Sequence, residues 1–281
     1  MREFKKSSKL DNVLYDVRGP VVEEANRMEA CGTQVLKLNI GNPAPFGFRT
    51  PDEVIYDMSH QLTDCEGYSP SQGLFSARKA IMQYAQLKKL PNVSIDDIYT
   101  GNGVSELINL CMSALLDDGD EILIPSPDYP LWTACATLAG GKAVHYICDE
   151  QSEWYPDIDD MRKKITDRTK AIVIINPNNP TGTYVPIGEL EAFADTLPED
   201  VLLVMDEAYM EFATEPDCCS MVDYMKAHPE KPILVLRTFS KYYAMAGLRV
   251  GYALSSEELI GIMRKCSASW NLNVCAQKAA E

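Results

Sequence analysis

Short runs of apolar residues alternate with longer amphipathic segments over most of the chain. Runs such as "AIVII" and "VLLVM" are apolar at every position, which indicates strands that are buried on both faces of a sheet. The strands predicted in this way are residues 97–100, 121–124, 143–147, 171–175, 201–205, 233–236 and 249–254. A further short strand is predicted in "VLKLNI", before a loop rich in proline and glycine.

Predicted helices lie between several of these strands. Their residues are 21–30, 74–87, 104–116, 158–165 and 255–266. The last helix is predicted to begin with a capping box formed by Ser255 and Glu258. Because strands and helices alternate, we expect an α/β fold in which helices cover both faces of a mostly parallel sheet.

The composition is that of a globular protein, with 46% hydrophobic and 24% charged residues among 281. A formal net charge of −15 argues against binding to nucleic acid or to an anionic membrane surface. It does not argue against an anionic ligand, because a few local cations can hold a phosphate. The sequence shows neither a run long enough to span a bilayer nor the apolar core of a signal peptide.

The nine cysteines lack zinc-type spacing and the three histidines are isolated, so we expect no metal site. Free thiols are typical of a reducing compartment, and we expect a cytoplasmic protein.

Five predicted strands are followed by loops that carry polar side chains. The loops are "TGNGVSE", "PSPDYPLW", "NPNNPTG", "DEAY" and "TFSK". Ligands of open α/β sheets bind at the carboxyl ends of parallel strands, so these loops are expected to converge on one edge of the sheet.

Taken singly, each loop has an ordinary explanation. The amides of Gly103, Val104 and Ser105 could hold an anion at a helix N-terminus, although the loop lacks the Gly-Lys-Ser/Thr of a Walker motif. Lys241 could be a surface lysine with a packed stem, and Arg249 a buried structural cation. Both lie in apolar surroundings, where a charge needs a partner.

Taken together and in order, the motifs resemble those of a known family. "GYSPSQG", "GNGVSE", "PDYP", "NNPTG", "DEAY" and "SK", followed by Arg249, are similar to the motifs of fold-type I, pyridoxal-phosphate-dependent aminotransferases of class I/II. The resemblance covers the chain from about Leu36 onward. It implies a three-layer αβα domain with a mixed sheet, pyridoxal 5'-phosphate as cofactor, and ping-pong transfer of an amino group between an amino acid and a 2-oxo acid.

The resemblance also implies the roles of residues around the cofactor ring. Lys241 resembles the lysine that binds the cofactor covalently and later moves a proton. Asp206 resembles the carboxylate that keeps the pyridine nitrogen protonated. Tyr209 and Asn179 resemble the pair that hydrogen-bonds the phenolic oxygen, and Tyr129 the aromatic side chain that stacks on the ring.

Arg249 resembles the bidentate partner of the cofactor phosphate. Thr238 and Ser240, with amides of the glycine-rich loop, complete the implied phosphate site. Tyr68 resembles a tyrosine that reaches the phosphate of the neighbouring subunit, which implies a homodimer with shared sites. The implied cofactor-binding residues are therefore Tyr68, Gly103, Val104, Ser105, Tyr129, Asn179, Asp206, Tyr209, Thr238, Ser240, Lys241 and Arg249.

The implied substrate contacts are fewer. Gly41 matches the loop that lies over the substrate carboxylate, near Asn179, and Tyr15 and Arg18 belong to the N-terminal arm. The text up to about Gly182 looks like bacterial alanine (glutamate–pyruvate) aminotransferases, and the text from Thr183 like histidinol-phosphate aminotransferases. Either the chain is an intermediate natural member or two related chains have been joined, and we favour the second.

From the resemblance we expect an N-terminal arm at 1–50 and a cofactor-binding domain at 51–281. The C-terminal segment of the small domain, with the arginine that grips the substrate α-carboxylate, is not found in the text, so turnover is expected to be impaired. A lyase, a racemase or a cofactor-binding regulator without turnover is the alternative. We also expect cis peptide bonds at Ser126-Pro127 and Asn179-Pro180.

Overall fold

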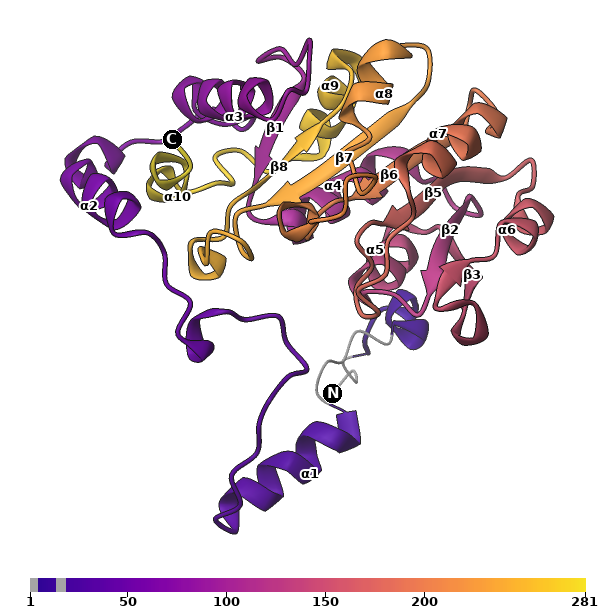
Figure 1. The fold of residues 1–281 in the computed structure, drawn as a ribbon, viewed down its shortest axis with the longest axis horizontal. Helices are drawn as coiled ribbons and strands as arrows, with labels where there is room; N and C mark the ends of the chain where they lie inside the picture. The colour runs from indigo at the N-terminus through magenta and orange to yellow at the C-terminus, as the bar shows by residue number, and fades with distance from the viewer. Residues whose placement is uncertain (1–4, 14–18) are drawn as a thin grey trace.

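The strands form one eight-stranded sheet in a computed structural model, which describes residues 5–13 and 19–281 (Figure 1). The strand order is β1-β8-β7-β6-β5-β2-β3-β4. The bounds are β1 Ile98–Gly101, β2 Glu121–Ser126, β3 Lys142–Asp149, β4 Tyr155–Pro156, β5 Thr169–Ile175, β6 Leu202–Asp206, β7 Ile233–Thr238 and β8 Gly251–Leu254.

The sheet is mixed. Strands β3, β2, β5, β6 and β7 are parallel neighbours, whereas β8 pairs antiparallel with both β7 and β1, and β4 pairs antiparallel with β3. Since β1 is antiparallel to β8, it points in the same direction as β7. The carboxyl ends of β1, β2, β5, β6 and β7 therefore lie at one edge of the sheet, as the five loops predict.

Helices cover both faces of the sheet (Figure 1). One face is covered by α4 (Val104–Leu115), α5 (Leu131–Ala139) and α9 (Glu257–Cys266). The other face is covered by α3 (Phe75–Leu87), α6 (Ile158–Lys164), α7 (Ile187–Thr196) and α8 (Val222–Ala227). In β5, Val173 packs into the first layer and Ile172 and Ile174 into the second, which explains why this strand is apolar at every position. The predicted αβα fold is confirmed.

Two further helices pack beside the sheet. Helices α2 (Asp52–His60) and α10 (Val274–Ala279) lie together around a small apolar cluster that contains Met245, Val250 and Leu272. Helix α1 (Gly19–Ala30) lies away from the sheet, and each of its residues is at least partly exposed (Figure 1). The division of the chain at residue 50 stays a prediction.

Three details of the predicted elements were wrong. Residues 35–40, all described, lie outside the sheet, because their alternating pattern finds no partner strand there. The cap of α9 is Ser256, whose hydroxyl accepts from the Leu259 amide, while the buried Ser255 hydroxyl donates to the Ile233 carbonyl. Helices α2, α5, α7, α8 and α10 were not predicted.

Candidate active site

Asp206 is the deepest of the predicted site residues. It ends β6 and is only 3% exposed. The Trp132 indole Nε1 donates to its Oδ2 at 3.1 Å, and the Ala208 amide donates to its Oδ1 at 3.2 Å. Burial raises the pKa of the Asp206 carboxyl to about 6, although both hydrogen bonds act to lower it. The site thus contains a carboxylate whose charge depends on its few donors.

Lys241 and Gly41 meet although 200 residues separate them. The Lys241 Nζ donates to the Gly41 carbonyl at 2.6 Å and lies 5.7 Å from the centroid of the Tyr209 ring. A Cβ at Gly41 would lie 2.8 Å from the Tyr209 hydroxyl and 3.1 Å from Nζ, so this close approach requires glycine. Burial, followed by the charge of Arg249, lowers the pKa of the Lys241 amine. The amine is thereby shifted toward its neutral, nucleophilic form.

Arg249 lies at the start of α4. A Cβ on Gly103, the residue before this helix, would lie 2.5 Å from Nη2 of Arg249. Gly103 has φ +75° and Arg249 has φ 59°, so both adopt the left-handed region of backbone space. The buried Thr238 and Ser240 are joined by a 3.0 Å bond from the Ser240 amide to the Thr238 hydroxyl. A guanidinium beside a helix N-terminus is a typical anion site.

The loop after β5 is held by a residue that sequence reasoning missed. Asn176 is fully buried; its side-chain amide donates to the Val185 carbonyl at 3.2 Å, and its Oδ1 accepts from the Val185 amide at 2.8 Å. Asn179 is half-buried in the loop that this pair closes. The predicted cis bonds at Ser126-Pro127 and Asn179-Pro180 are confirmed, and Asn176-Pro177 is also cis.

The comparisons with known proteins agree with this geometry. A family model described as "Aminotransferase class I and II" matches residues 33–281. The chain belongs to the class I and II aminotransferases. Enzymes of this family move amino groups between amino acids and 2-oxo acids.

Similar proteins cover nearly the whole of this aminotransferase chain. The glutamate-pyruvate aminotransferase AlaA of Escherichia coli K12 is 47% identical over 100% of this chain and 71% of its own length. The alanine aminotransferase structure from Pyrococcus furiosus matches with a TM-score of 0.90 at 36% identity, over 98% of this chain and 72% of that chain. Histidinol-phosphate aminotransferase 2 of Carboxydothermus hydrogenoformans is 37% identical over 96% of this chain and 71% of its own length. The similarity to the alanine-type protein extends past residue 183, and that to the histidinol-phosphate type is more distant.

The family implies pyridoxal phosphate as cofactor, and the residues present fit this group. Gly103 leaves space beside the Arg249 guanidinium that a Cβ would fill, which suits a phosphate. At the other end, the buried Asp206 carboxylate suits a protonated ring nitrogen, and the Lys241 amine suits an aldehyde.

The remaining predicted residues of the aminotransferase are spread more widely. Tyr129 is half-buried on the turn that leads into α5. Tyr68 is 83% exposed and stacks on Trp270, with ring centroids 4.7 Å apart. Its contact with a neighbouring subunit stays a prediction. Tyr15 and Arg18 lie outside the described residues.

Trp132 was the second residue missed by sequence reasoning. It is fully buried and comes three positions after Tyr129, on the first turn of α5. A buried indole N–H needs an acceptor, and this was the one available signal that a polar group faces it.

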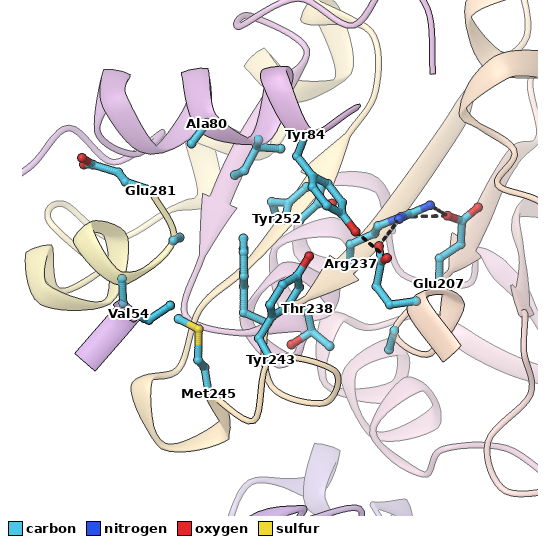
Figure 2. A pocket seen from close by; sticks show the side chains of 16 residues that line it. Val54, Ala80, Tyr84, Glu207, Arg237, Thr238, Tyr243, Met245, Tyr252 and Glu281 are labelled. Atoms are coloured by element: carbon cyan, nitrogen blue, oxygen red, sulfur yellow. Dashed lines mark hydrogen bonds and ion pairs between the residues drawn. The ribbon is translucent and has the colours of Figure 1, made fainter. Parts of the chain in front are cut away.

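A cavity of about 220 Å³ borders the site at Ala208 and Thr238 (Figure 2). Arg237 lies at one end of this cavity, where its guanidinium donates to Glu207 at 2.8 Å and to Glu211 at 2.7 Å. Tyr84 donates its hydroxyl to the same Glu211. Because these carboxylates compensate the Arg237 charge, the cavity is not a second anion site.

Two searches of the described residues concern other classes of site. Among residues 5–13 and 19–281, no group of three or more His, Cys, Asp or Glu side chains is placed to hold a metal ion. Within the same part of the chain, none of the helices is both long and apolar enough to cross a membrane.

Proposed function

We propose that this aminotransferase exchanges amino groups between L-alanine and 2-oxoglutarate in two half-reactions, with pyridoxal phosphate held at the carboxyl edge of the sheet. The observation that carries the proposal is the convergence there of Lys241, Asp206 and Arg249, which come from three different loops. When bound, the cofactor supplies a carbonyl carbon that takes up the amino group and a ring that stabilises negative charge at the substrate Cα.

Lys241 is the proposed attachment and proton-transfer residue. Its lowered pKa favours a neutral Nζ, which is the form that can attack a carbonyl carbon. Once released, the same Nζ can accept the proton from the substrate Cα and return it elsewhere. The contact with the Gly41 carbonyl supports a position of Nζ at the mouth of the site, where the substrate carboxylate would lie against Gly41.

Asp206 is proposed to hold a proton on the ring nitrogen by its negative charge. Tyr209 and Asn179 would hydrogen-bond the phenolic oxygen, and Tyr129 would cover the ring face. Burial, and then the Asp206 charge, raises the pKa of the Tyr209 phenol, so Tyr209 is a hydrogen-bond donor at neutral pH.

The cofactor phosphate would lie against the Arg249 guanidinium and the first amides of α4, with the Thr238 and Ser240 hydroxyls beside it. The proximity of Gly103 to Arg249 supports this position. An Arg fork and a helix N-terminus both favour a dianion, and the combination is stronger than either alone.

We further propose a homodimer in which Tyr68 of one subunit reaches the phosphate site of the other. Tyr68 projects from the surface, and large apolar side chains of the N-terminal segment, among them Leu36, Leu38 and Phe48, are exposed. Apolar side chains that gather on one exposed segment are typical of an interface. Tyr15 and Arg18 are proposed as substrate contacts on the strength of the family resemblance.

The alanine-type substrate pair is supported by the 47% identity to a glutamate-pyruvate aminotransferase, compared with 37% for the histidinol-phosphate type. The test is steady-state kinetics of the 281-residue protein with L-alanine and 2-oxoglutarate, and separately with histidinol phosphate as donor. We expect turnover with alanine and parallel double-reciprocal lines, as two half-reactions require.

Borohydride reduction followed by peptide mapping tests the site itself. We expect the cofactor to be fixed on Lys241. Fixation on another lysine, or faster turnover with histidinol phosphate than with alanine, would contradict the proposal. Lys170 on β5, which lies far from the loops at the carboxyl edge, is a suitable control for non-specific labelling.

A further inference from the structure

We propose that Trp132 is a positioning residue whose indole N–H keeps the Asp206 carboxylate charged and fixes the direction in which it faces the site. The inference deepens the proposed function, since it rests on Asp206 as the partner of the ring nitrogen. The geometry behind it belongs to the protein alone and can be tested without cofactor.

The first step is the hydrogen bond. Trp132 has zero exposure and donates from Nε1 to Oδ2 of Asp206 at 3.1 Å. A buried indole could have used a backbone carbonyl as acceptor, as the buried Tyr146 hydroxyl does with Val173. Instead the indole bonds the one carboxylate at this position of the sheet edge, and a charged acceptor makes the bond about twice as strong as a neutral one.

The second step is the position of Trp132 in the chain. Its backbone amide donates to the Tyr129 carbonyl at 3.1 Å, within the turn that opens α5. The same turn therefore carries the proposed ring-stacking tyrosine and the donor to Asp206. Because the indole is packed in the core between α4, α5 and the sheet, its N–H cannot turn away from the carboxylate.

The third step is the balance of charges around Asp206. Burial disfavours the ionised form, and Glu207 on the next position adds to this effect. Opposing it are the Trp132 and Ala208 donors and the charge of Lys241. Tyr209, the remaining titratable neighbour, is neutral near pH 7 because burial and Asp206 both raise its pKa. Among the causes that favour ionisation, the Trp132 bond is the largest.

The consequence concerns protonation near neutral pH. With both donors present, the Asp206 pKa is about 6, so the carboxylate is mostly charged at pH 7. Without the indole donor the pKa must rise, and a large part of the population becomes a neutral acid. A neutral acid does not hold a proton on a ring nitrogen by charge. Trp132 therefore acts on the reaction through Asp206 and not by contact with substrate.

The experiment measures the Asp206 pKa in cofactor-free protein by ¹³C NMR of labelled aspartate, assigned with D206N. Three proteins are compared with the wild type. W132F removes the donor, replacement of Trp132 by 3-benzothienylalanine removes the N–H while keeping the indole shape, and Y146F removes a buried aromatic donor that does not touch Asp206.

We expect both Trp132 variants to raise the Asp206 pKa by about 1 to 2 units, as loss of a hydrogen bond to a charged group implies. Y146F should leave it unchanged. In cofactor-loaded protein, the acid limb of the kcat/KM profile should move upward by a similar amount in the Trp132 variants only.

An unchanged Asp206 pKa in the benzothienylalanine protein would overturn the proposal, and this protein decides the matter if W132F does not fold. The proposed function fails by a different result, namely the absence of borohydride-fixed cofactor on Lys241. The two failures are therefore distinguishable.

Discussion

At the scale of single residues, Asp206 shows how burial can work against the charge that a site needs. Its carboxylate is almost without solvent contact, and its pKa of about 6 lies well above the value near 3.9 of an unfolded chain. Folding therefore favours the protonated form. A site residue of this kind lowers the stability of the fold at the pH where it is useful.

The sign of this effect can be measured. Between about pH 4 and pH 6, folded protein retains a proton on Asp206 that unfolded protein releases, so the free energy of unfolding falls as pH rises. The full cost, about 3 kcal/mol, is present above pH 6 and disappears below pH 4. D206N removes this titration. In urea unfolding of the cofactor-free proteins, we expect wild type to lose up to about 3 kcal/mol relative to D206N between pH 4 and pH 7.

The control for this measurement is D223N, which changes a carboxylate on α8 outside the site. Its unfolding curve should follow that of wild type more closely across the same range. If the wild-type and D206N curves stayed parallel from pH 4 to pH 7, the Asp206 pKa would be ordinary and the electrostatic account of the site would be wrong.

At the scale of elements, the start of α4 and the β7–β8 connection form one phosphate-sized site. Gly103 precedes the helix with φ +75°, and the Arg249 guanidinium occupies the space where its side chain would be. The backbone conformation and the close approach both require glycine at this position.

G103A should therefore weaken cofactor binding through its phosphate. The methyl group must displace the guanidinium, and a left-handed alanine costs roughly 1–3 kcal/mol, so we expect about 10-fold weaker binding or more. Absorbance titration with pyridoxal phosphate measures this affinity. G188A is the matched control, because Gly188 lies in α7 with open space around its Cα. Equal affinities of the two variants would place the phosphate elsewhere.

The elements also show which features the sequence could predict. Strands β5 and β6 were predicted because apolar residues at every position suit a strand between two helical layers. Helix α5 was missed because "LWTACATLA" is short and apolar around most of its circumference, which hides the helical period. Residues 35–40 were wrongly predicted as a strand because alternation gives a pattern but not a partner.

The site followed the same rule. Asp206, Lys241 and Arg249 could be found from motifs, and strand direction was enough to bring their loops to one edge. The Trp132 and Asn176 bonds depend on which side chains meet across the fold, and local sequence does not contain that information.

At the scale of the whole molecule, the exposed N-terminal segment supports the proposed dimer. Leu38 is 73% exposed, and Leu36 and Phe48 are similarly open to solvent. Segments of this kind are stable in water when a partner covers them.

L38E should therefore weaken dimerisation without unfolding the sheet, because the new charge would be buried at the interface. Sedimentation velocity over a range of protein concentrations measures the change, and we expect a shift toward monomer of at least about 10-fold in dissociation constant. L87E is the control, since Leu87 is 81% exposed at the end of α3. If L38E and L87E associated equally, Leu38 would lie outside the interface.

The antiparallel pairing of β7 with β8 has a consequence for how this chain can vary. Lys241 and Arg249 both lie on the excursion that leaves β7 at Thr238 and returns at Gly251, and these two residues are paired in the sheet. Both ends of the excursion are therefore fixed, and its length sets the separation of the amine and the guanidinium. Insertions or deletions between residues 242 and 248 should be excluded from functional variants, whereas the exposed turn at residues 214–217 should accept them.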